Sequence, residues 1–211
     1  MCDESPDTDE LLRRAGAADE SAAGALLERH RVRLRHMVAV RIDPRLAARV
    51  DPSDVVQDAL AEAYVRLPDY LRTRPLPFYP WLRHIAWERL VHLHRQHVRA
   101  QKRAVTREDG WQLPLPDDSA MQLADRFLSQ EISPSGQAAR EEIRLRVSAA
   151  LEQLPSHYRE VIILRHLERL TFQETAGVLG MTEAATRSRY RRAVERLHKC
   201  LSGDDWGDLD D

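Results

Sequence analysis

The chain has 211 residues, 43% of them hydrophobic and 31% charged, which suits a helical protein of one large or two small domains. The acidic N-terminus lacks an apolar core, and no apolar run approaches the roughly 18 residues of a membrane span, so we expect neither a secretory signal nor membrane insertion. Two cysteines without a CxxC pair argue against a disulfide framework and a cysteine-rich zinc site, and they favour a cytoplasmic location.

The net charge of −2 conceals alternating blocks of opposite charge. Residues 29–49 hold seven arginines and one acid, residues 72–107 hold nine bases and one acid, and residues 183–199 hold six bases and two acids. Such blocks indicate several surfaces with different partners, two of them suited to a phosphate backbone. Solvated helix faces with disordered acidic ends are the alternative interpretation.

The first part of the chain is predicted to begin with a disordered segment and two helices. Residues 1–18 are acidic and expected to be disordered. A helical pattern that includes Val32 runs over residues 19–42. A second helix opens at the Asp51-Pro pair, a capping residue followed by proline at the first helical position, and it is expected to end near Pro68.

A proline-rich loop and a long helix are predicted next. Residues 72–80 contain three prolines and are expected to form a rigid loop. The helix starts at Trp81 and runs to about Arg103, with an apolar face opposite a polar face edged by aromatic residues, as a docking helix has. Residues 19–104 are therefore predicted to form a first helical domain.

The remainder of the chain is predicted to hold a linker and a second helical domain. Residues 105–139 contain glycines, prolines and acids, which predicts an acidic flexible linker with a short helix near residues 121–127. Helical periodicity then resumes, so we expect a domain over residues 140–202 and an acidic tail over 203–211. The predicted fold class is all-α, with two small helical domains.

The segment from Leu170 to Leu201 carries the strongest local pattern. Thr171 and Glu174 have the spacing of a capping box that starts a short helix. Gly180 suits a sharp turn with positive φ, and Thr182 can cap the helix after it. Two helices joined by such a turn, the second one basic, form the helix-turn-helix that reads DNA. An ordinary helical hairpin with a solvated arginine face is the alternative.

Four ordered motifs together resemble an extracytoplasmic-function (ECF) sigma factor of the bacterial sigma-70 family. Asp54-Val-Val-Gln-Asp58 resembles the DLVQE-type motif by which region 2 grips the clamp helices of RNA polymerase. Pro77-Phe-Tyr-Pro-Trp-Leu-Arg-His-Ile-Ala86 resembles the FxxWLxxIA signature of the promoter-melting helix. Leu154-Pro-Ser-His-Tyr-Arg-Glu-Val-Ile-Ile-Leu-Arg165 resembles the LPxxxREVxxLR opening of region 4, and the helix-turn-helix follows at the family's spacing.

The resemblance implies a factor that docks on the β′ clamp and β flap of core RNA polymerase, recognises promoter DNA and assists melting, with an anti-sigma factor as a further partner. It implies no enzyme activity, cofactor or metal. The implied polymerase contacts are Asp54, Val55, Gln57 and Asp58. The implied −10 and melting contacts are Arg74, Phe78, Tyr79, Trp81, Arg83, His84, Trp87, Glu88, Arg95 and Arg99. The implied −35 contacts are Thr182, Thr186, Arg187, Ser188, Arg189, Arg191 and Arg192.

Two residues depart from the family pattern. Thr186 stands where an aliphatic residue is usual, and Glu88 stands where asparagine is usual. Thr186 keeps one methyl group for packing. The Glu88 carboxylate, near nucleic acid, can accept a hydrogen bond from cytosine N4 and so alter base choice.

Two other functions stay open from the residues alone. An autonomous helix-turn-helix regulator would bind operators without polymerase and would not need the 54–58 motif. A helical adaptor would use its charged faces for protein partners. His92, His94 and His97 lack a suitably spaced acidic or cysteine partner, so no metal site is predicted. No nucleophile beside a base and no glycine-rich phosphate loop are recognisable, so no catalytic site is predicted either.

Overall fold

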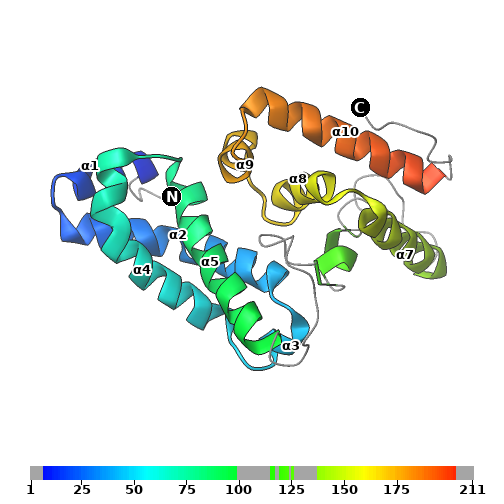
Figure 1. Cartoon of the computed structure of the whole chain (residues 1–211), viewed down its shortest axis with the longest axis horizontal. Helices are drawn as coiled ribbons and strands as arrows, with labels where there is room; N and C mark the ends of the chain where they lie inside the picture. The colour runs from blue at the N-terminus through cyan, green and yellow to red at the C-terminus, as the bar shows by residue number, and fades with distance from the viewer. Residues whose placement is uncertain (1–6, 99–114, 117–118, 124, 126–136, 203–211) are drawn as a thin grey trace. The chain divides into compact units, whose positions relative to one another are not determined.

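The computed structural model describes residues 7–98, 115–116, 119–123, 125 and 137–202, and within these ranges the regular elements are α-helices (Figure 1). This confirms the predicted all-α class. The chain divides into two compact units, Met1–Pro114 and Leu115–Asp211. In the described ranges, no helix combines the length and the apolar character needed to cross a membrane. The functional domain limits at residues 104 and 140 stay predictions.

The first unit is built around α2. Its helices are α1 (Thr8–Gly16), α2 (Glu20–Arg41), α3 (Pro44–Ala47), α4 (Pro52–Thr73) and α5 (Phe78–Val98). α2 packs against α1, α4 and α5, and α4 also packs against α5 (Figure 1). Their inward side chains form an apolar core whose fully buried members include Leu26, Leu34, Met37, Val56, Leu82 and Ile85.

Aspartate side chains begin the first four helices. Asp7, Asp19, Asp43 and Asp51 occupy the N-cap positions, and each carboxylate accepts a backbone N–H of the following residues. The hydrogen bond from the Ala22 N–H, aided by Arg14, holds the pKa of the Asp19 carboxyl below its usual value. The hydrogen bond from the Ser53 N–H does the same to the pKa of Asp51.

The prediction that residues 1–18 are disordered is wrong for Thr8–Gly16, which form α1. This helix buries Leu11, Leu12 and Ala15, and it packs against α2 and α4. The apolar spacing behind the capping Asp7 indicates such a helix, but the acidic composition of the segment obscures it. Residues 1–6 lie outside the described part of the chain.

The end of α4 differs from prediction, because the helix passes through Pro68 and continues to Thr73. A proline inside a helix leaves the carbonyl four residues earlier without its usual donor. Pro68 is exposed, so water can supply that hydrogen bond. The helix ends at Arg74, whose φ is 41° and whose N–H donates to the Tyr70 carbonyl at 2.7 Å.

The start of α5 also differs, since the helix begins at Phe78 rather than Trp81. Pro80 falls in the first turn, where a missing backbone N–H has no intrahelical partner to lose. The rigid loop predicted over residues 72–80 therefore shortens to residues 74–77. The predicted continuation of this helix to Arg103 lies outside the described residues beyond Val98.

The second unit is built around α10. Its helices are α7 (Gln137–Gln153), α8 (Ser156–His166), α9 (Phe172–Leu179) and α10 (Glu183–Ser202), and α10 packs against the other three (Figure 1). Buried side chains of its core include Leu151, Leu154, Ile162, Leu164, Leu170 and Ala193. α7 begins at Gln137, within the 105–139 segment that is predicted as a linker. Residues 119–123 are helical, and most other linker residues and the 203–211 tail lie outside the description.

Candidate functional site

The helix-turn-helix has the geometry that its sequence predicts. The Thr171 hydroxyl accepts from the Glu174 N–H at 3.1 Å, and the Glu174 carboxylate accepts from the Thr171 N–H at 2.8 Å. These two bonds complete the capping box of α9. Gly180 ends α9 with a φ of 63°. The Thr182 hydroxyl then accepts from the Ala185 N–H at 3.2 Å and caps α10.

Most predicted −35 contacts lie on the accessible surface of α10. Those that are exposed are Thr182, Arg187, Arg191 and Arg192, and those that are half-buried are Ser188 and Arg189. Four arginines and two short hydroxyls are thus accessible, with Arg187 and Arg191 one turn apart on one face of α10 and Arg189 on the opposite side. Guanidinium groups bind phosphate and guanine edges, and hydroxyls can reach bases or phosphate, so this part of α10 is suited to duplex DNA.

Thr186 is the exception and corrects a predicted contact. Its side chain is fully buried, and its hydroxyl donates to the Thr182 carbonyl at 3.0 Å. Because no part of this side chain reaches the surface of α10, it cannot touch DNA. The residue packs in the interior of the helix-turn-helix.

Arg187 is exposed and yet held by two neighbours. Its Nη2 lies 2.6 Å from a carboxylate oxygen of Glu183, one turn earlier on α10. Its Cζ lies 4.4 Å from the ring centre of Phe172 on α9. The same ring lies 4.1 Å from the Cζ of Arg165 and meets the ring of Tyr190 edge-on at 5.5 Å. α9 and α10 together thus orient this arginine of the candidate DNA surface.

Four predicted −10 contacts are buried, which corrects the prediction that they touch nucleic acid directly. Phe78, Tyr79, Arg83 and Trp87 keep only 4–7% of their surface accessible. Phe78 packs against the ring of Tyr70 at 5.5 Å, and the Arg83 Cζ lies 5.5 Å from the Trp87 ring. These side chains hold α5 in its unit, and as packed here they are not available to stack on bases.

Trp81 is the predicted aromatic contact that stays partly accessible. It is half-buried and stacks on Tyr70, with ring centres 4.4 Å apart and planes 29° apart. The Tyr70 hydroxyl donates to the Leu76 carbonyl at 3.0 Å, so this ring pair also closes the loop between α4 and α5. Burial raises the pKa of Tyr70, which keeps that donor protonated.

The remaining predicted contacts near α5 are polar and accessible. Arg74, His84 and Arg95 are exposed, Glu88 is half-buried, and Arg99 lies outside the described residues. A carboxylate oxygen of Glu88 lies 3.5 Å from Nη1 of Arg66 on α4, and the other lies 3.6 Å from Nε2 of His84. The Arg66 guanidinium therefore places a positive charge beside the unusual carboxylate, which moderates its repulsion of phosphate.

The predicted polymerase contacts lie in the first turns of α4. Asp54, Gln57 and Asp58 are exposed, whereas Val55 is buried in the core, which corrects its predicted role as a contact. Asp58 accepts from Nη2 of Arg89 on α5 at 2.7 Å. Asp54 and Gln57 thus remain the accessible polar groups of this motif, while Asp58 also ties α4 to α5.

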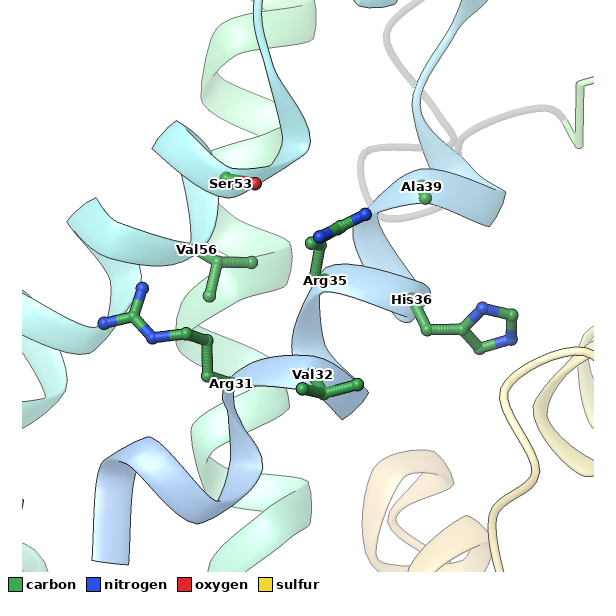
Figure 2. A pocket seen from close by; sticks show the side chains of 7 residues that line it. All are labelled: Arg31, Val32, Arg35, His36, Ala39, Ser53 and Val56. Carbon is green, nitrogen blue, oxygen red and sulfur yellow. The ribbon is translucent and has the colours of Figure 1, made fainter. Parts of the chain in front are cut away.

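A pocket of about 450 Å³ lies beside this motif, between α2 and the start of α4 (Figure 2). From α2 come Arg31, Val32, Arg35, His36 and Ala39, and from α4 come Ser53 and Val56. Val32, which is part of the helical pattern predicted over residues 19–42, is 79% exposed. The buried Leu27, Leu34 and Val38 are separated by four or seven residues, the spacing of one helix face, and Val32 does not fit this spacing. This mismatch is the sequence signal that identifies Val32 as a surface residue.

The site presents charged helix surfaces. Among the residues that the structure describes, no group of three His, Cys, Asp or Glu side chains could hold a metal ion. Of the histidines considered above, His92 pairs with the Gln96 amide nitrogen at 2.8 Å. Surfaces of this kind suit macromolecular partners, nucleic acid above all where arginines gather.

The second unit matches a known family model. Residues 144–197 match the model described as sigma-70, region 4. The match begins within α7, includes all of α8 and α9, and ends near the C-terminus of α10. It therefore covers α9, the turn and most of α10.

Most of the chain is similar to known RNA polymerase sigma factors. It is 32% identical over 192 residues to the ECF RNA polymerase sigma-E factor of Escherichia coli (strain K12), with 89% of this chain and 90% of that protein covered. It is 29% identical over 189 residues to the ECF RNA polymerase sigma factor SigD of Mycobacterium bovis, with 90% and 81% covered. A solved structure, CnrH in complex with the cytosolic domain of CnrY, is similar with a TM-score of 0.51 and 26% identity, covering 94% of this chain and 100% of that one.

Proposed function

The chain belongs to the extracytoplasmic-function sigma factors of RNA polymerase, and on that basis we propose that it directs the core enzyme to specific promoters and helps to open them. The observation that carries the proposal is the 32% identity to the sigma-E factor across 89% of the chain, which includes both units. In this proposal the polymerase performs the chemistry in the cytoplasm, and the chain is a binding factor rather than an enzyme. The comparisons give no support to the alternative, an operator-binding regulator that acts without polymerase.

The start of α4 is proposed to bind the β′ clamp of the polymerase. Asp54 and Gln57 offer exposed polar groups, and the neighbouring pocket adds Val32 with two arginines of α2. An apolar centre beside charged and polar groups is the usual composition of a specific protein interface. The polymerase surface proposed here is therefore wider than the 54–58 motif and includes this face of α2. The second unit is proposed to meet the β flap.

Two further surfaces are proposed to bind promoter DNA. On α10, the four arginines and Ser188 would read the −35 element from the major groove. On α5, the accessible side chains would meet the −10 element and the opened strand; they are Trp81, His84, Glu88 and Arg95, with Arg74 beside them. The buried Phe78, Tyr79, Arg83 and Trp87 would support this surface from within the unit.

A regulatory protein partner is also proposed. The structure similar to this chain contains CnrH together with the cytosolic domain of CnrY. By analogy, we infer that a protein of anti-sigma type binds this chain. Copurification of the full chain with proteins of its host, followed by inhibition of transcription with the purified candidate, tests this inference.

In vitro transcription with purified core polymerase and a matched promoter tests the main proposal. Promoter-dependent initiation that requires the chain is the expected result, and failure to bind core polymerase would overturn it. Replacing Asp54 and Gln57 by alanine is expected to lower polymerase affinity, because both are exposed on α4. Arg187→Ala is expected to spare polymerase affinity and to reduce discrimination at the −35 element by about 1–3 kcal/mol, the range for a bidentate base contact.

A further inference from the structure

We propose that Phe172 on α9 is a positioning residue for promoter recognition, because its ring holds Arg187 of α10 in the orientation in which that arginine reads the −35 element. The inference rests on the proposed function, since it requires α10 to meet promoter DNA. Phe172 is not among the residues that the motif comparison predicts to contact DNA. It would act through the arginine and touch no base itself.

The ring of Phe172 is fixed from several directions. Phe172 is the first residue of α9, directly after Thr171, so the capping box holds its backbone. The Tyr190 ring meets it at 5.5 Å with an interplanar angle of 76°. Tyr190 in turn lies 2.8 Å from Nε2 of His166, measured from its hydroxyl oxygen. The ring of Phe172 is therefore a platform at the start of α9 that contacts with side chains of α8 and α10 hold in place.

Arg187 rests on this platform while most of it remains accessible. Its side chain is 59% exposed, and its Cζ lies 4.4 Å from the Phe172 ring centre. Its Nε and Nη2 both donate to one oxygen of Glu183, at 3.0 and 2.6 Å. The Nη1 donors bond no other side chain in the described part of the protein, and a base edge or a phosphate can accept from them.

This arrangement reduces the entropy that Arg187 loses on binding DNA. A free arginine side chain populates many rotamers, and ordering them opposes binding. A guanidinium over an aromatic ring at an exposed site gains enough to shift an equilibrium about two- to fivefold. If Arg187 keeps this contact when it binds, removal of the ring weakens recognition. If Arg187 has to leave the ring to reach a base, removal of the ring strengthens recognition, so the sign of the effect tests the proposal.

The experiment uses the full chain with core polymerase and a pool of promoter duplexes randomised across the −35 element. Sequencing the bound fraction gives the base preference at each position for the wild type, Arg187→Ala, Phe172→Leu and the double variant. Arg187→Ala is expected to identify the base pairs that depend on this arginine. Phe172→Leu is expected to lower the preference at those base pairs about two- to fivefold, and at no others. In the Arg187→Ala background, Phe172→Leu is expected to add nothing.

Two further variants separate positioning from packing. Phe172→Tyr keeps the ring and is expected to retain the wild-type preference. Tyr158→Leu is the matched control, because the Tyr158 ring lies 4.8 Å from the Cζ of another α10 arginine, Arg196, and its loss is expected to leave the same base preferences unchanged. If thermal unfolding shows that Phe172→Leu does not fold, Phe172→Met replaces it, since methionine also fills the space without a ring.

Four results would overturn the inference. They are an unchanged or increased preference in Phe172→Leu, a uniform loss at all positions, an equal loss in the Arg187→Ala background, and no position that depends on Arg187. Failure of the wild-type chain with polymerase to select any −35 sequence would instead overturn the proposed function, and the inference with it. The two failures are therefore distinguishable in one data set.

Discussion

Replacing Thr186 by valine is expected to stabilise the second unit without weakening DNA recognition. The Thr186 hydroxyl donates to the Thr182 carbonyl at 3.0 Å. That carbonyl already accepts the backbone N–H of Thr186 at 2.9 Å. Loss of the hydroxyl therefore leaves no backbone group unsatisfied, and the side chain is buried away from any DNA surface.

The magnitude follows from two contributions of opposite sign. A second hydrogen bond to a carbonyl that is already satisfied is worth about 0.5 kcal/mol, the low end of the net range for such bonds. A buried methyl group in place of the hydroxyl contributes about 0.8 kcal/mol. The balance favours valine by about 0.3 kcal/mol, or about 1–2 °C in Tm for a unit of this size.

Calorimetry of the full chain measures this change, and Thr175→Val provides a matched comparison. Thr175 on α9 is also fully buried, and both its hydroxyl and its N–H donate to the Thr171 carbonyl, at 2.7 and 2.9 Å. A similar rise in Tm is expected. A fall in Tm for Thr186→Val, or a loss of −35 preference in it, would refute the reasoning that this hydroxyl is dispensable and remote from DNA.

Gly180→Ala is expected to cost about 1–2 kcal/mol of unfolding free energy in chemical denaturation, because a Cβ there meets no atom within 4 Å and only the left-handed backbone opposes it. A cost near zero would contradict this. Since the fold lowers the carboxyl pKa values of Asp19 and Asp51, their stabilisation is fully present above the ordinary value of about 3.9 and is lost as pH falls through the lower folded values. Denaturation at successive pH values below about 5 checks this, and asparagine variants at both positions should show a shallower decline. Val32→Glu is expected to weaken polymerase binding and leave stability unchanged, whereas Val65→Glu, at a valine of α4 that is 77% exposed, should preserve both. Equal loss of polymerase affinity in the two variants would argue against the pocket as part of the interface.

Local sequence rules for helix ends were sufficient to predict the helix-turn-helix. The capping box of Thr171 and Glu174, the left-handed Gly180 and the cap at Thr182 each depend on a few neighbouring residues. Such interactions are readable from spacing, because the backbone geometry of a helix end demands them. The same applies to the start of α4, which Asp51 caps.

The environments of individual side chains depended on packing across helices, which spacing alone does not specify. Phe78 and Tyr79 were predicted to contact the −10 element, but in the helix that starts at Phe78 both side chains are buried in the unit. Val32 belongs to the helical pattern predicted over residues 19–42, and the structure leaves it exposed at an open pocket between α2 and α4. An aromatic or aliphatic side chain suits both a core and a contact surface, so only the tertiary arrangement distinguishes them.

The corrected N-terminus bears on the construction of chimeric factors. Because α1 buries Leu11, Leu12 and Ala15 in the first unit, a recombinant hybrid that takes its −10 specificity from this protein has to retain the chain from Asp7 onward. A hybrid cut at residue 19 would expose the apolar side chains of α2 and α4 that α1 covers, and it would be prone to aggregation. Modular exchange of promoter selectivity is thus limited by a helix that is remote in sequence from every proposed promoter contact.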